Sequence, residues 1–79
     1  MIIDLNRTRK SGIFYKDEVI NVPTTSFIYT HVQIMNHQDI QVCFLLNVAE
    51  ATQRMFYRRR FSDGSYAIFR EVINSKEVL

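Results

Sequence analysis

The chain of 79 residues has few of the residues that define special protein classes: one cysteine, one proline, two glycines and no tryptophan. The single Cys43 cannot form an internal bridge, which excludes a scaffold held by disulfides. Low glycine and proline content excludes a collagen-like chain, and 47% hydrophobic with 13% aromatic residues excludes a disordered one. We therefore expect one small domain with a thin core, which self-association would help.

Signatures of catalysis are also missing. The two glycines, Gly12 and Gly64, are too far apart to form a phosphate-binding loop, and there is no nucleophile elbow. His31, on a strand, and His37, in a turn, are interpreted as ordinary polar residues, because two ligands alone rarely hold zinc. Cys43 lies in an apolar strand and is expected to be an inert core residue. The sequence thus predicts a protein that is not an enzyme and has no metal and no cofactor.

The sequence shows neither a signal peptide nor a membrane-spanning segment. The first seven residues lack the apolar segment of a signal peptide, and the longest apolar run, 42–46, is too short to cross a bilayer. An unpaired cysteine fits a reducing compartment. We expect a cytoplasmic protein that does not interact with a membrane.

Positive charge is absent from the middle of the chain. Between Asp17 and Gln53 there are four acidic residues and no Lys or Arg, and the basic residues concentrate in 7–16 and 54–60. Such a distribution produces a local potential that the net charge of +2 conceals. A basic surface of this kind could meet nucleic acid or an acidic protein surface, or could simply keep the domain soluble.

Two segments, 26–35 and 40–48, alternate between apolar and polar residues and are separated by the turn-forming residues 36–39, which predicts a β-hairpin. In the second segment the alternation is unbroken, and it predicts a buried face made by Ile40, Val42, Phe44, Leu46 and Val48. Cys43 and Leu45 make the opposite face partly apolar, so this strand is expected to be central.

A second hairpin is predicted from 55–61 and 65–73, which flank an Asp-Gly turn. Its second strand would place Tyr66, Ile68 and Val72 opposite Ala67, Phe69 and Ile73. Asn47 and Glu50 resemble a capping box, so a helical turn at 48–53 followed by a strand is favoured over a longer helix near 48–58.

The predicted fold is mainly β: a small antiparallel sheet or open barrel of about five strands, with or without one short helix. The alternative is an α+β fold with the helix near 48–58. Residues 1–11 are expected to be a flexible arm, or an edge strand through Ile2, Ile3 and Leu5, and residues 12–79 a single β-rich domain.

The segment Arg54–Phe61 combines four arginines with three aromatic residues and is the strongest candidate binding site. Guanidinium groups beside aromatic rings suit phosphates and stacked bases, and they also suit acidic protein surfaces. A purely structural interpretation buries Met55, Tyr57 and Phe61 and leaves Arg58 and Arg60 at a sheet edge. The predicted binding residues are Arg54, Phe56, Tyr57, Arg58, Arg59 and Arg60.

A family resemblance covers roughly residues 13–64. The order Val22-Pro23, Thr30-His31-Val32-Gln33, Leu45-Leu46-Asn47-Val48 and Thr52-Gln53-Arg54-Met55-Phe56 resembles a small domain family of unknown function found in phages and bacterial genomes. Phe44 stands where that family tends to have tryptophan, and the family's closing Gly-Thr-Gly-His is absent. The resemblance implies a small β domain of mobile-element origin, and it provides no activity or functional residues to transfer to this chain.

The sequence therefore predicts a non-enzymatic domain that binds proteins. We expect a phage or mobile-element modulator that binds an acidic surface of a host protein and inhibits it in the host cytoplasm. The modulator can also form a homodimer. The alternative is a β domain that binds single-stranded nucleic acid through the Arg and aromatic residues of 54–61.

Overall fold

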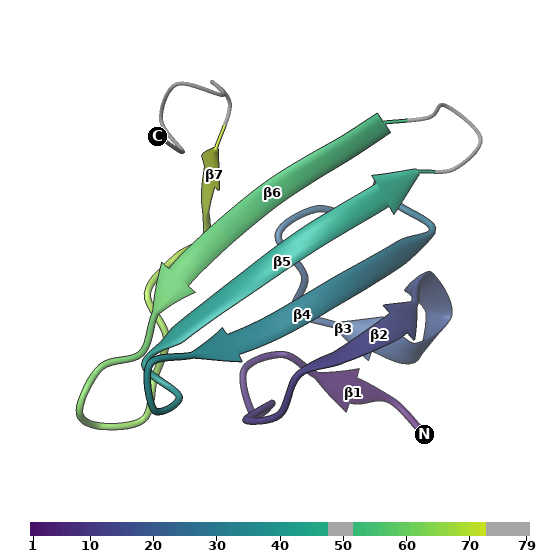
Figure 1. Ribbon diagram of the computed structural model, residues 1–79. Coiled ribbons are helices and arrows are strands. Elements are labelled where there is room, and N and C mark those ends of the chain that lie inside the picture. The colour runs from purple at the N-terminus through teal and green to yellow at the C-terminus, as the bar shows by residue number, and fades with distance from the viewer. Residues whose placement is uncertain (48–51, 73–79) are drawn as a thin grey trace.

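The computed structural model describes residues 1–47 and 52–72. Its main element is a five-stranded antiparallel sheet in the order β2-β4-β5-β6-β7. The strands are β2 (Gly12–Tyr15), β4 (Tyr29–Met35), β5 (Ile40–Asn47), β6 (Thr52–Arg59) and β7 (Arg70–Val72). The prediction of a mainly β fold with about five strands and a central third strand, β5, is confirmed (Figure 1).

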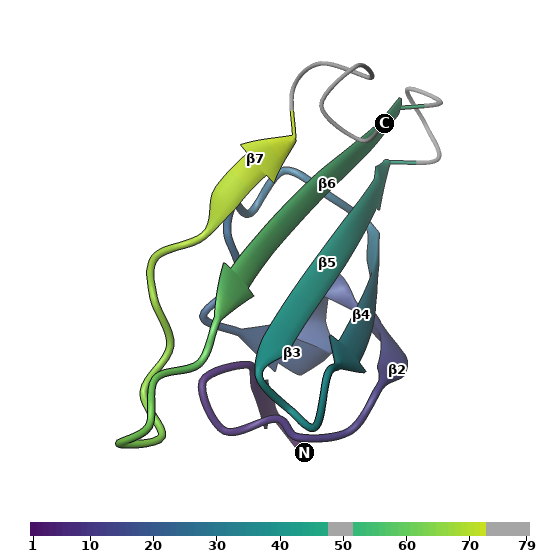
Figure 2. The same cartoon turned by 60° about the vertical axis from the view of Figure 1, so that its left-hand side comes forward.

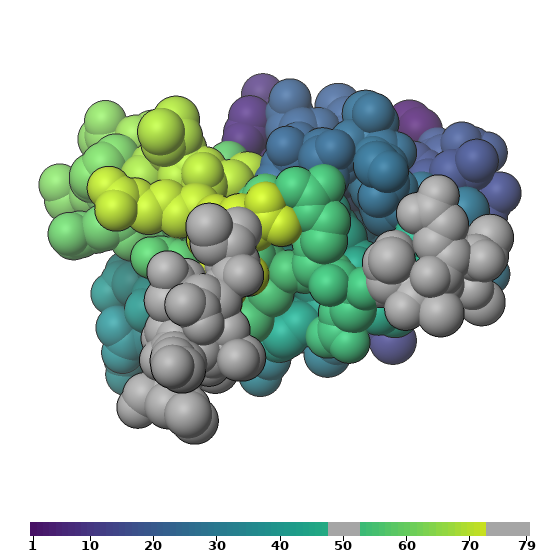
Figure 3. All heavy atoms as spheres, turned by 90° about the horizontal axis from the view of Figure 1, so that it is seen from above, coloured from purple at the N-terminus to yellow at the C-terminus, as the bar shows by residue number. Residues whose placement is uncertain are grey.

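The N-terminal residues cover one face of this sheet. β1 (Ile3–Asp4) pairs in parallel with β3 (Val19–Ile20), and a short 3-10 helix, η1 (Lys16–Glu18), leads into β3. Leu5 is fully buried, and of the residues proposed for an N-terminal edge strand only Ile3 lies in a strand, β1. Seen from above, the purple and blue N-terminal half lies along one side of the teal and green strands (Figure 3).

The core lies between the sheet and this N-terminal layer. Its buried residues are Leu5, Val19, Phe27, Val32, Cys43, Leu45 and Phe56. A Cβ at Gly12 would lie 2.7 Å from the tip of the Phe14 ring, so a larger residue at this position would require the ring to shift. Turning the molecule by 60° shows β3 behind β4 and β5 (Figure 2).

The register of β5 corrects one prediction. Its odd-numbered residues Gln41, Cys43 and Leu45 face the N-terminal layer, whereas Phe44 is only half-buried and points to the other side. The strand alternates as predicted, but the covered face is the opposite one, and of the described residues predicted to be interior in this strand only Val42 is buried. Alternation shows that the two faces differ and does not say which one the rest of the chain will cover.

The turns follow the predicted chemistry. Residues 36–39 connect β4 and β5, with the amide of Asp39 donating to the carbonyl of Asn36, and with positive φ at Asn36, His37 and Gln38. Gly64, at φ +92°, closes the turn after β6, and Asp63 Oδ1 accepts from both the amide and the hydroxyl of Ser65. Asparagine and glycine tolerate these left-handed conformations better than other residues.

The longer-helix alternative is wrong for residues 52–58, which belong to β6. Likewise, Thr52 and Gln53 of the predicted helical turn are part of this strand, while its residues 48–51 lie outside the described residues. The strand wins because Thr52–Arg59 pairs along its whole length with β5.

Candidate functional site

The six predicted binding residues divide between the two faces of the sheet. The pairing of β6 with β5 places Arg54, Phe56 and Arg58 opposite Leu45, Cys43 and Gln41, on the covered face. Tyr57 and Arg59 pair with Val42 and Ile40, on the face that the N-terminal layer does not cover. The strand alternates as predicted, but two of its three arginines, Arg54 and Arg58, are on the covered face, and Arg58 is buried there.

Arg58 is the clearest correction. Its side chain was expected at the surface with Arg60, yet the residue is only 7% exposed. Nε donates to Gln41 Oε1 (2.7 Å) and Nη1 to Asn6 Oδ1 (3.0 Å). Burial lowers the pKa of the guanidinium, since desolvation disfavours its charged form.

Two aromatic rings complete the surroundings of Arg58. Its guanidinium carbon lies 4.3 Å from the ring centre of Tyr66 and 4.0 Å from that of Phe69. Cations over aromatic rings are attracted by the electron-rich ring faces. Arg58 thus acts as a structural cation that joins the sheet to the N-terminal turn and to the segment after β6.

One extra residue in the segment between β6 and β7 brings the rings of Tyr66 and Phe69 to Arg58. Tyr66 forms an isolated β-bridge with Arg60, and Arg70 pairs with Tyr57. Between these two pairs, three residues of the later segment, 67–69, lie opposite two residues of β6, 58 and 59. A bulge of this kind lets Tyr66 and Phe69, three positions apart, reach the same side. The predicted uninterrupted strand 65–73 put them on opposite faces and was wrong. The regular strand β7 covers only Arg70–Val72, and Ile73 lies outside the described residues.

Arg54 and Phe56 are also engaged within the domain. Arg54 forms two hydrogen bonds with the carboxylate of Glu71, at 2.6 and 2.7 Å, and this partner lowers the pKa of Glu71. The Arg54 guanidinium lies 5.0 Å from the ring centre of Phe56, and that ring belongs to the core. These residues hold β6 to β7 and to the covered face.

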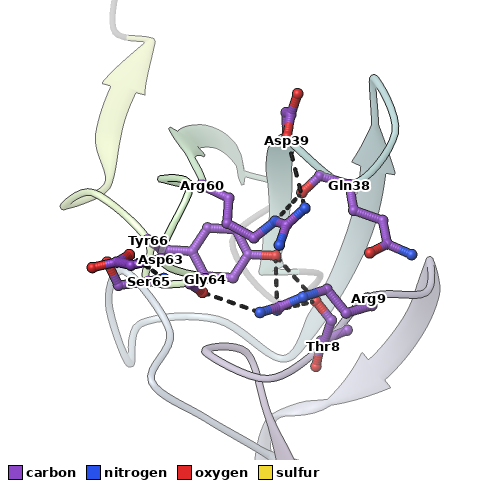
Figure 4. A network of polar contacts seen from close by, with 9 residues as sticks. All are labelled: Thr8, Arg9, Gln38, Asp39, Arg60, Asp63, Gly64, Ser65 and Tyr66. Carbon is purple, nitrogen blue, oxygen red and sulfur yellow. Dashed lines mark hydrogen bonds and ion pairs between the residues drawn. The ribbon is translucent and has the colours of Figure 1, made fainter.

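Arg60 and Arg9 anchor the turns at one end of the sheet (Figure 4). Arg60 Nε donates to the carbonyl of Gln38, and its Nη2 lies 3.7 Å from Asp39. Arg9 donates to the carbonyl of Gly64 and to the hydroxyl of Tyr66. Both arginines therefore join segments distant in the sequence.

The uncovered side of the sheet, which we call the open face, is rich in apolar and aromatic side chains. Figure 1 views β4, β5 and β6 from this side. The strand registers place in it two groups, one apolar or aromatic and one polar. The first is Ile13, Tyr15, Tyr29, Met35, Ile40, Val42, Phe44, Leu46, Met55, Tyr57 and Val72, and the second is His31, Gln33, Gln53, Arg59 and Arg70.

Several of these side chains are in contact with one another and with solvent. Tyr15 and Tyr29 pack edge to face with ring centres 5.5 Å apart, and His31 lies 5.7 Å from Phe44. Ile13 is 69% exposed, and Tyr29, Met35 and Tyr57 are also exposed. A shallow groove of about 650 Å³ runs between β5, β6 and β7, and Val42, Tyr57 and Arg70 line it. Contiguous exposed apolar surface of this kind is typical of interaction sites.

The charge of the open face has one sign. Arg59 and Arg70 are its charged residues, and neither forms an ion pair with any residue in 1–47 or 52–72. None of the side chains that the registers place on this face is acidic. Of the predicted binding residues, Tyr57 and Arg59 therefore remain available to a partner.

Groups capable of metal or redox chemistry are sparse in the described part of the chain. No three His, Cys, Asp or Glu side chains gather there in a way that could hold a metal ion. Cys43 is fully buried, as predicted, and its burial raises the pKa of the thiol to about 12. Within the same residues no helix is long and apolar enough to cross a membrane.

Sequence reasoning identified the alternation of β5 but missed the open face as the candidate site. Its signal was visible: the longest unbroken apolar alternation in the chain, Ile40 to Leu46, was assigned to the interior. Comparison with protein-family models, with curated proteins and with solved structures found no match for this chain.

Proposed function

We propose that this protein is a non-enzymatic domain that binds another protein on its open face. The observation that carries the proposal is the reversed pattern of β5. Its apolar residues Ile40, Phe44 and Leu46 lie on the uncovered side, whereas Gln41 lies fully buried on the covered side. Apolar surface left in water is a source of binding free energy when a partner removes it from solvent.

The residue types of the open face fit an interface. Tyrosine, methionine, phenylalanine and arginine are enriched in the centres of protein interfaces, and Tyr57 beside Arg59 supplies two of them. The flat shape, with Cα extents of 38 × 36 × 17 Å, offers a broad surface relative to the volume of the domain. Tyr57 is the proposed anchor.

Charge indicates the chemistry of the partner. Arg59 and Arg70 project from an open face without acidic side chains, so a partner with apolar residues and carboxylates complements it. A second copy docked face to face would bring these like charges together. We therefore propose a different protein as the partner, and the resemblance to phage domains suggests a host factor that is inhibited by the contact.

The same surface could stack the bases of single-stranded nucleic acid. We favour a protein partner because domains that bind nucleic acid usually have a large excess of basic residues. The open face carries only two arginines, and the net charge of the chain is only +2. Titration with a mixed-sequence oligonucleotide at two salt concentrations tests the alternative. Micromolar binding that weakens steeply with salt would favour nucleic acid over protein.

The test compares two charge reversals. Arg59→Glu changes the open face, and Arg7→Glu changes an exposed arginine in the turn after β1, on the N-terminal layer. Each tagged variant is used for capture from the lysate of a candidate host. We expect one acidic protein to be retained by the wild type and by Arg7→Glu, and lost with Arg59→Glu.

Light scattering provides the second measurement. A protein that is monomeric with its open face free supports a heterologous partner. A stable dimer disrupted by Arg59→Glu, or a captured protein lost equally with both variants, would contradict the proposal.

A further inference from the structure

We propose that the recess beside Arg58 is a binding site for a carboxylate group. It lies on the other side of the sheet from the open face and does not depend on the function proposed above. The site is built from the buried guanidinium, a recess next to it and the bulged segment after β6.

Arg58 has one hydrogen-bonding nitrogen that no described residue satisfies. Nε and Nη1 are bound to Gln41 and Asn6, whereas Nη2 is buried without a hydrogen-bond partner. The residue is 7% exposed, and a buried charged donor left unpaired is costly. A ligand atom that accepts from Nη2 would relieve this cost.

The positive charge around Tyr66 is not neutralised by direct ion pairs. The guanidinium of Arg9 lies 5.1 Å from the Tyr66 ring centre, and that of Arg58 lies 4.3 Å from it. No carboxylate oxygen of the described residues is within 4.0 Å of either arginine's nitrogens. An anion at this place would be attracted by two cations in a partly desolvated setting.

A recess of about 420 Å³ adjoins Arg58. Asn6 and Asn21 give it amide groups, and Val22, Pro23 and Ile68 give it apolar walls. Ile68 is 84% exposed and lies in the bulge 67–69. The bulge belongs to no regular strand, although Ala67 donates to the carbonyl of Arg59 (2.9 Å), and we expect this segment to shift when a ligand reaches the buried Nη2.

A single negative charge fits this site better than a phosphate. Asp4 is close enough for its charge to interact with Arg58, and its carboxylate already accepts from Asn21 Nδ2 (2.7 Å) and from the amide of Asn6 (2.9 Å). Its negative charge opposes a dianion more than a monoanion. One guanidinium nitrogen and a neighbouring amide also match the two oxygens of a carboxylate.

Nuclear magnetic resonance tests the site with acetate as the probe. The Nε–Hε signal of Arg58 is assigned by its loss in Arg58→Gln. Acetate is expected to shift this signal saturably in about the millimolar range, which is reasonable for so small a ligand. Acetamide, which has the same shape without the charge, serves as the control and is expected to cause no saturable shift.

A second pair of variants keeps the test independent of folding defects. Ile68→Asp puts a negative charge at the exposed rim and should weaken acetate binding about fivefold or more, whereas Ile68→Asn should leave it nearly unchanged. Equal effects of the two variants would contradict the proposal. So would the absence of a saturable acetate shift in the wild type, or binding of phosphate in preference to acetate.

A free acid and an acidic side chain share this chemistry. Acetate and glutamate blocked at both backbone ends are therefore titrated in parallel. Tighter binding of the blocked glutamate supports a peptide side chain as the ligand, and tighter binding of acetate supports a free small acid.

Discussion

On the covered face of the sheet, β5 contributes Gln41, Cys43 and Leu45, whereas on the open face it contributes Ile40, Val42, Phe44 and Leu46. The covered face thus includes a buried amide, and beside it the buried cation of Arg58. The open face has the longer apolar series, of which Val42 is buried and Ile40, Phe44 and Leu46 are half-buried. Burial in this domain follows from where the N-terminal segment packs, not from which face of the strand is the more apolar.

The polar residues of the covered face determine how the N-terminal layer packs. Gln41 accepts from Arg58 and donates to the carbonyl of Leu5 (2.9 Å). Arg58 in turn donates to Asn6, next to Leu5. A buried hydrogen bond forms at a single register of the two segments, so it specifies how they pack more strictly than apolar contacts do. The hydrogen bonds among Arg58, Gln41 and the N-terminal turn therefore position Leu5 over the sheet.

The largest expected effect contrasts two adjacent leucines. Leu45 is 1% exposed on the covered face, and Leu46 is half-buried on the open face. Leu45→Ala should lower the free energy of unfolding by about 3 kcal/mol, because it leaves a cavity in the core, and Leu46→Ala by about 1 kcal/mol. Urea unfolding measures both. Similar losses would mean that the open face is covered in the isolated protein.

The adjacent arginines provide the second contrast. Arg58→Met should lower the free energy of unfolding by about 3 kcal/mol, because it leaves the buried Gln41 without its donor and removes the hydrogen bond to Asn6. Arg59→Met should change it by no more than about 0.5 kcal/mol, as expected for an exposed side chain. If thermal or urea unfolding gave equal values for the two variants, Arg58 would not be a structural cation.

Alkaline pH should weaken the covered face through Cys43. The thiol has a pKa of about 12 in the fold, compared with an ordinary value of 9.0. Between these values the unfolded chain loses its proton and the folded protein keeps it, so stability falls as pH rises from about 9 to about 12. The slope is about 1.4 kcal/mol per pH unit for this group.

Unfolding experiments across this range should therefore show a steeper loss in the wild type than in Cys43→Ala. The variant differs from the wild type at this one side chain, so the difference between the two slopes isolates the thiol. Parallel curves would exclude a buried, protonated Cys43.

The smallest effect is expected at the rim of the covered face. Glu71→Gln removes the exposed ion pair with Arg54 and should lower the unfolding midpoint slightly at neutral pH. Because the pair lowers the pKa of Glu71, its contribution is present above the ordinary pKa of the carboxyl and disappears as pH falls through the lowered value. Asp17→Asn, a change at an exposed acid that forms no ion pair with the described residues, is the control and should leave the unfolding midpoint at neutral pH unchanged.

Local features of the structure were largely predictable. Periodicity located β4 and β5, and turn-forming residues located the connections at 36–39 and 62–64. The candidate site was less accessible, since Tyr57 and Arg59 alternate with Phe56 and Arg58, and nothing local says which pair turns inward. The bulge at 67–69 could not be predicted either, because it depends on how two rings pack against Arg58.

The amino acid sequence by itself determined that this chain forms short strands, where most of them turn, and that β5 has two distinct faces. These features depend on neighbouring residues, whose propensities and two-residue period act over a few positions. Only the tertiary structure decided that Leu5 and Val19 cover the side of Cys43, that Arg58 is enclosed, and that Phe44 and Tyr57 stay accessible. Those outcomes depend on contacts between residues far apart in the chain, and a one-residue change of register would reverse them.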